Sequence, residues 1–272
     1  MVTMGPAALE PFPRVARYNS PYRAHRDGRA VDLYPGTATA PSPVAGTVVE
    51  TRSTRAPSRP YAAAEDHLIV IDTGEALARI LHVDPAVDQG TTVELGQSLG
   101  RLIRSGYFAP WVDNHVHLGF RAYGTDPVRA SGSLPVELGV PIEPVRWDGT
   151  GTVREVGETY AMLDAPEHPG PGEGYAGIAD DTGQVALDGG IPHYETGGAY
   201  STADVELDGI ALLGAEIPAS AGTVEWPDLT VRANGEAITG LSFVLGREAL
   251  GAKLICPDVE CAVGDQVGVE IG

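Results

Sequence analysis

The stretch Asp113-Asn114-His115-Val116-His117-Leu118-Gly119-Phe120 places two histidines one residue apart. Side chains alternate along a β-strand with a period of two, so His115 and His117 are predicted to share one face. Val116 and Leu118 then point to the opposite face, toward a core. The pattern is typical of a half-buried strand with a polar site on its open face. The alternative is a pair of solvent-exposed strand histidines.

The composition predicts a mainly β protein with many turns. The chain has 272 residues, and short Val/Ile/Leu/Thr runs alternate with its 35 glycines and 22 prolines. This length allows one large or two ordinary domains. We predict an extended lead-in over residues 1–20, an antiparallel β-sheet or sandwich domain over residues 21–140, and a second β-rich domain over residues 145–272.

The second half of the chain shows strand alternation more often than helical periodicity. A short helix is expected near residues 241–250. The expected strands are 151–156, 159–163, 203–207, 222–226 and 266–271.

The charge of the chain restricts its partners. Its 18 basic and 37 acidic residues give a formal net charge of −19, and Lys253 is the only lysine. Such an acidic surface repels phosphate backbones, which disfavours nucleic-acid binding. The same composition is typical of a protein adapted to concentrated salt, where electrostatic screening shortens to a few ångströms.

Membrane spans and export signals are not expected. The sequence contains no run of 18 apolar residues, and its first residues lack a basic region followed by an apolar stretch. On this basis the sequence predicts a cytoplasmic protein. Cys256 and Cys261 do not make a zinc site on their own, and they are interpreted as reduced core residues or a local disulfide, with the reduced form favoured.

Further polar residues suited to chemistry lie on separate predicted strands. His25 and Asp32 bracket a polar turn, and Asp32 is either a ligand or a residue on a solvated strand face. Two apolar runs, 67–73 and 77–85, predict a hairpin. His82 lies near the end of its second strand, at the expected rim of the sheet, whereas His67 opens the first strand and is interpreted as structural.

This set of side chains suits zinc catalysis. Catalytic zinc sites usually have three protein ligands drawn from His, Asp and Glu, with water in the fourth position. The metal lowers the pKa of that water to roughly 7, and nearby imidazoles move protons. Two histidines and an aspartate as ligands, with two further histidines beside them, meet these needs.

In their order along the chain, these residues resemble the lysostaphin-type (LytM-like) zinc metallopeptidases. The resemblance covers about residues 20–130. Six residues separate His25 from Asp32, where members of that family normally have three. The landmarks are His25 and Asp32, the Ala40-Pro41-Ser42-Pro43-Val44-Ala45-Gly46-Thr47-Val48 strand, the hairpin from His67 to His82, the Val93-x-x-Gly96-Gln97-x-x-Gly100 turn, and His115-Val116-His117-Leu118.

The resemblance implies an antiparallel sheet of the duplicated hybrid motif type, with a narrow groove. It implies that His25, Asp32 and His117 bind one zinc ion, and that His82 and His115 are the catalytic histidines. The implied reaction is hydrolysis of a peptide bond in a substrate of the cell-envelope type. Members of that family mostly act outside the cytoplasm.

Two other functions are compatible with the sequence. The first is a non-catalytic binding or scaffold protein that keeps the fold with a degenerate metal site. The second is a carbohydrate- or surface-layer-binding protein in which the second domain carries the function. In that domain, the glycine-flanked residues His193, Tyr194 and Glu195 form either a ligand-binding loop or, as the favoured interpretation, a surface turn.

Overall fold

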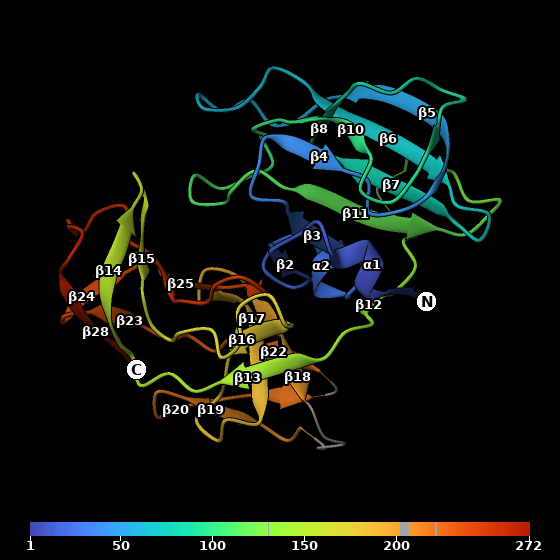
Figure 1. The fold of residues 1–272 in the computed structure, drawn as a ribbon. Helices are drawn as coiled ribbons and strands as arrows, with labels where there is room; N and C mark the ends of the chain where they lie inside the picture. The colour runs from blue at the N-terminus through green and yellow to red at the C-terminus, as the bar shows by residue number, and fades with distance from the viewer. Residues whose placement is uncertain (130, 202–206, 221) are drawn as a thin grey trace. The chain divides into compact units, whose positions relative to one another are not determined.

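A computed structural model of the chain describes residues 1–129, 131–201, 207–220 and 222–272 (Figure 1). With 45% of residues in strands and 3% in helices, it confirms the mainly β prediction. The chain forms two compact units: residues 1–15 with 27–140, and residues 16–26 with 141–272. Among the described residues, no helix is long and apolar enough to cross a membrane.

Six antiparallel strands form the main sheet of the first unit. The predicted hairpin is its central pair. In sheet order the strands are β3 (Ala30–Tyr34), β11 (Val116–Arg121), β7 (Leu77–Leu81), β6 (Asp66–Asp72), β5 (Gly46–Thr54) and β9 (Thr92–Val93). A second sheet has the order β4 (Thr39–Pro41), β10 (Ser98–Leu102) and β8 (Val83–Pro85).

Strand β11 has the alternation that its sequence predicts. Val116, Leu118 and Phe120 are buried on one face. His117 and Arg121 lie on the other face, because side chains two positions apart on a strand point the same way. The apolar face contributes to the core of this unit, and the polar face carries the candidate site.

The first 20 residues, predicted as an extended lead-in, contain regular structure instead. They form β1 (Val2–Met4), α1 (Pro6–Leu9) and β2 (Arg14–Ala16). Pro6 occupies the start of α1, where proline has the right φ and no helical donor is lost. Strand β1 pairs in parallel with β12 (Val136–Leu138), a partner too distant in the sequence for local patterns to reveal.

Among the described residues, eleven strands form the main sheet of the second unit. Their order in the sheet is β21 (Ala219–Ser220), β22 (Thr223–Glu225), β18 (Thr196–Ser201), β17 (Val185–Ile191), β25 (Gly240–Phe243), β27 (Lys253–Ile255), β15 (Tyr160–Leu163), β14 (Thr150–Val156), β28 (Gln266–Ile271), β23 (Val231–Ala233) and β24 (Glu236–Ile238). The remaining elements of this unit are α2 (Arg23–Arg26), β13 (Ile142–Val145), β16 (Tyr175–Ile178), β19 (Ile210–Leu212), β20 (Ala215–Ile217) and β26 (Leu245–Gly246).

The sequence predicted the strands of the second unit better than its helix. Strands β14, β15, β22 and β28 confirm four of the five expected segments, and 203–207 falls mostly outside the described residues. The helix expected at 241–250 is wrong, since β25 and β26 occupy its first half. Leu241, Phe243 and Leu245 recur with a period of two, and all three are buried.

Residues 16–26 belong to the second unit because they bind its central strands. The Asp188 carboxylate of β17 accepts hydrogen bonds from the backbone N–H groups of Arg17, at 2.6 Å, and Tyr18, at 3.1 Å. The Asn19 side-chain amide donates to Ser242 Oγ at 2.7 Å and to the Phe243 carbonyl at 2.9 Å. These buried bonds fix the segment that leads into α2.

Candidate functional site

Asp32 and His117 face each other on adjacent strands. The antiparallel register of β3 and β11 pairs these two residues directly. His117 Nδ1 donates to Asp32 Oδ1 at 2.9 Å, and the Asp32 carboxylate is almost fully buried. The strand alternation that the sequence displays therefore brings an imidazole and a carboxylate together on the polar face of the sheet.

His25 joins this pair from the helical turn α2. Its Nδ1 donates to the Arg17 carbonyl at 2.8 Å, so Nε2 is the ring atom that could bind a metal. Gly28, at φ +63°, turns the chain from α2 into β3. The long spacing between His25 and Asp32 is thus taken up by a helical turn and a glycine bend.

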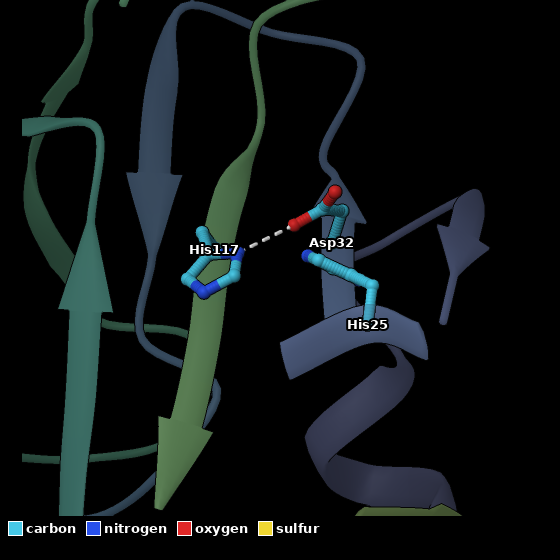
Figure 2. Close-up of side chains that lie close together, drawn as sticks. All are labelled: His25, Asp32 and His117. Carbon is cyan, nitrogen blue, oxygen red and sulfur yellow. Dashed lines mark hydrogen bonds and ion pairs between the residues drawn. The ribbon is translucent and has the colours of Figure 1, made fainter. Parts of the chain in front are cut away.

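His25, Asp32 and His117 each offer one ligand atom, and these atoms all lie within 4.8 Å of one another (Figure 2). Zinc–ligand bonds are about 2 Å long, so ligand atoms around one ion lie at most about 4 Å apart. Atoms up to 4.8 Å apart would have to approach one another by up to about 1 Å to bind one ion. One carboxylate and two imidazoles are a donor set that zinc accepts, so the residues fit the metal that the resemblance implies.

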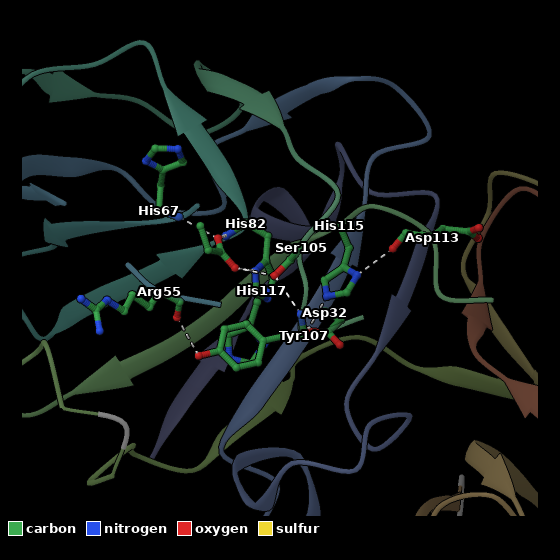
Figure 3. Close-up of polar contacts among 10 residues, drawn as sticks. Asp32, Arg55, His67, His82, Ser105, Tyr107, Asp113, His115 and His117 are labelled. Carbon is green, nitrogen blue, oxygen red and sulfur yellow. Dashed lines mark hydrogen bonds and ion pairs between the residues drawn. The ribbon is translucent and has the colours of Figure 1, made fainter. Parts of the chain in front are cut away.

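His115 lies beside this cluster. Its Nδ1 donates to the Asp113 carbonyl at 2.9 Å, and its Nε2 is 3.3 Å from Asp32 Oδ1 (Figure 3). Because a carbonyl can only accept, Nδ1 carries a proton, and Nε2 faces the Asp32 carboxylate. The His115 side chain is buried.

His82 follows the last residue of β7 in a left-handed conformation, at φ +70°. Such a conformation is uncommon for residues other than glycine and occurs often at functional sites. The ring centroid of His82 is 5.4 Å from that of His115 and 5.7 Å from that of His117. Burial lowers the pKa of His82, so its neutral form is favoured. The structure thus brings all five predicted site residues together.

A buried network behind His82 was not foreseen from the sequence. Asp66 Oδ2 accepts hydrogen bonds from His82 Nδ1 at 2.6 Å and Ser105 Oγ at 2.5 Å. Its Oδ1 accepts from the backbone N–H groups of His67 and His82. Burial raises the pKa of Asp66, but the His82 and Ser105 hydrogen bonds outweigh this effect, and the pKa falls to about 2. Asp66 is therefore an ionised, fully buried partner of His82.

Aromatic side chains enclose the two catalytic candidates. The Phe108 ring centroid lies 4.3 Å from that of His115 and 4.7 Å from that of His82. Tyr34 lies 5.0 Å from His115, and Tyr107 lies 6.2 Å from His82. Tyr107 is also partly exposed, and its hydroxyl donates to the Arg55 carbonyl (Figure 3). The apolar surroundings limit water around both imidazoles.

His67, interpreted from the sequence as structural, and His168 do not belong to this cluster. His67 contacts Ser53 Oγ at 3.4 Å and lies 3.8 Å from the exposed Asp84 carboxylate. His168 Nε2 contacts the Gly246 carbonyl at 3.1 Å, in the second unit. Neither residue belongs to a group that could hold a metal among the described residues.

The glycine-flanked loop of the second unit combines buried and exposed residues. Glu195 forms an exposed ion pair with Arg26 at 2.7 Å, whereas Tyr194 is buried. Both ring nitrogens of His193 are shielded from solvent, and burial lowers the pKa of this histidine to about 4. The loop is therefore in part a packed structural turn.

The low pKa of His193 predicts a pH-dependent contribution to stability. An unfolded histidine titrates near 6.5, so its contribution is fully present above that pH and is lost as the pH falls through 4. Asp188, whose pKa burial raises to about 6, acts in the opposite direction. The test is therefore the difference in unfolding free energy between wild type and His193→Gln. We expect it to fall by about 3 kcal/mol between pH 7 and pH 4. A difference that does not change with pH would contradict the prediction.

Comparison with known proteins gives a match over both halves of the chain. A family model for the N-terminal domain of the domain of unknown function DUF8155 matches residues 3–138, and one for the C-terminal domain of DUF8155 matches residues 143–272. The search of curated proteins gives no match. Neither family model describes a peptidase, and all five clustered site residues lie within the N-terminal match. The chain belongs to the DUF8155 family.

Proposed function

We propose that this protein is a zinc-dependent hydrolase that cleaves peptide bonds. One observation carries the proposal: the ligand atoms of His25, Asp32 and His117 lie within 4.8 Å of one another, with two further imidazoles beside them. Structural zinc sites are usually closed by four protein ligands, whereas catalytic sites have three and an open position. Three ligands beside two aromatic-enclosed histidines fit the catalytic class.

The hydrogen bonds of the ligands support metal binding. His25 uses Nδ1 for the Arg17 carbonyl, and this second contact fixes both the ring orientation and the tautomer. The His117–Asp32 hydrogen bond places two ligand groups side by side, and to bind zinc through Nδ1 the neutral His117 ring would carry its proton on Nε2 instead. When bound, zinc would polarise a substrate carbonyl and lower the pKa of water toward 7.

His82 and His115 supply proton transfer in this proposal. Each ring donates from Nδ1, to Asp66 and to the Asp113 carbonyl respectively, so Nε2 is the atom left for proton transfer, and Nε2 of His115 lies 3.3 Å from Asp32 Oδ1. A neutral imidazole with a free Nε2 accepts a proton from water or, once protonated, donates one to a leaving amine or an oxyanion. The Asp66 carboxylate stabilises the protonated form of His82 in the way an aspartate supports a catalytic histidine.

The first test of the proposal is the zinc content of the purified wild-type protein in high-salt buffer, followed by a peptide-library digest. We expect about one zinc per chain, and cleavage that stops on dialysis against a chelator and returns with added zinc. A protein that binds zinc and cleaves no peptide would refute the peptidase assignment. A protein that binds no zinc would favour the non-catalytic binding or scaffold function instead.

A further inference from the structure

The sheet face that carries Asp32 and His117 continues beyond the metal cluster. In the register of β11 with β7, Gly119 lies opposite Arg79. Arg121 is two residues beyond Gly119, so its side chain is on the same face. Two arginines therefore follow the cluster along one face of the main sheet.

Arg121 is the fixed member of this pair. It is fully buried, and its Nη1 donates to the Phe120 carbonyl and to Ser133 Oγ, while Nη2 donates to the Arg129 carbonyl. Burial lowers its pKa to about 10, and the neighbouring positive charge of Arg79 acts in the same direction. Arg121 is thus a rigid positive charge close to Arg79.

Arg79 has a different environment. Its side chain is partly exposed, and its Nε is shielded from solvent without a hydrogen-bond partner among the described residues. Within that same part of the chain, no ion pair includes Arg79. Burial lowers its pKa, and Tyr107 is the one neighbour that opposes this effect.

This arrangement is unusual in so acidic a chain. Acidic residues outnumber basic ones by 37 to 18, yet Arg79 has no carboxylate partner among the described residues. Two like charges that are partly removed from water raise the free energy of the folded protein unless a bound anion neutralises part of that charge. The planar guanidinium fork binds a carboxylate through two parallel hydrogen bonds, which makes a carboxylate the best-matched anion.

Tyr107 connects this pair to the catalytic candidates, because it interacts with Arg79 and its ring lies 6.2 Å from that of His82. We propose that Arg79, with Arg121 behind it, binds a carboxylate of the peptide substrate next to the scissile bond. The inference rests on the proposed function and narrows its substrate class to peptides with an acidic side chain or a free C-terminus near the cleavage point.

A direct test uses a pair of probes that differ in one charge. The probes are N-acetyl-alanyl-alanine with a free carboxylate and its C-terminal amide, added to the full-length protein at constant ionic strength. The arginine Nε–H signals are followed by NMR. We expect the carboxylate probe to shift the Arg79 Nε–H signal at concentrations at least tenfold lower than the amide probe. Arg79→Gln should remove the difference between the probes.

Arg101→Gln is the matched control, because Arg101 is an exposed arginine on β10, in the other sheet. This variant should keep the preference for the carboxylate probe. Equal binding of the two probes by wild type, or a preference that survives in Arg79→Gln, would overturn the site. Potassium chloride alone provides a further control. If it shifts the Arg79 Nε–H signal and the carboxylate probe adds nothing to that shift, chloride is the bound anion and the carboxylate site is overturned.

The measurement is independent of zinc content and of cleavage. A protein that takes up zinc and cleaves peptides, but does not distinguish the two probes, would overturn only the carboxylate site. A protein that distinguishes the probes and neither binds zinc nor cleaves peptides would overturn only the hydrolase proposal.

Discussion

Replacing His117 by alanine should remove zinc from the protein, from about one ion per chain to less than about a tenth of that under the same dialysis conditions. The variant deletes one of three ligand atoms and also the 2.9 Å contact that orients Asp32. A site with two ligands left holds zinc much less tightly. The measurement is elemental analysis of the dialysed protein, and any peptidase activity should fall with the zinc content.

The matched control for this variant is His67→Ala. His67 lies on β6 of the same sheet, is partly exposed, and contacts Ser53 rather than the cluster. It should keep wild-type zinc content. Equal zinc content in wild type and His117→Ala would show that the ion binds elsewhere. Circular dichroism of both variants checks that neither has lost its fold.

Replacing Asp66 by asparagine should lower kcat by about 100-fold or more on a peptide that the library digest identifies, with zinc content unchanged. Oδ1 of Asp66 accepts from two backbone N–H groups, so the asparagine oxygen will take that place. Its amide group then faces His82 Nδ1 and donates to it. The proton of the neutral His82 ring moves to Nε2, which can no longer accept a proton from water.

Two further variants distinguish the loss of His82 orientation from a general loss of folded structure. Ser105→Ala removes one donor to Asp66 and leaves the His82 contact in place, so its kcat should fall much less. Asp84→Asn changes an exposed carboxylate near His67 and should have no effect. A wild-type kcat in Asp66→Asn would contradict the role of Asp66 in orienting His82. The same conclusion would follow if this variant lost zinc in proportion to its loss of activity.

The sequence revealed the parts of the site that depend on local patterns. The shared face of His115 and His117 follows from strand geometry alone, whereas their grouping with Asp32 came from the family resemblance. Asp66 went unnoticed, although it stands next to His67 in the sequence. Its partners His82 and Ser105 lie 16 and 39 residues away; the register of the hairpin brings His82 to it, and Ser105 comes from the segment that follows β10.

The same limit explains what was wrong in the fold. Residues 1–20 include a strand whose partner lies more than 100 residues away, as the pairing of Val2 with Val136 shows, so local patterns do not reveal it. The segment 241–250 contains enough Leu, Ala and Glu to suggest a helix, but its apolar residues follow strand spacing and pair with β17 and β27. Tertiary pairing overrides local propensity in both segments.

The anchoring of residues 16–26 affects how the protein can be divided. The match to the first family model ends at residue 138 and the match to the second begins at residue 143. These limits suggest a fragment for expressing the N-terminal half alone. A fragment that stops there keeps His25 but loses Asp188, Ser242 and Phe243, the partners of the segment that bears it. Expressing the N-terminal half alone would therefore leave the segment before α2 without the buried partners that fix it.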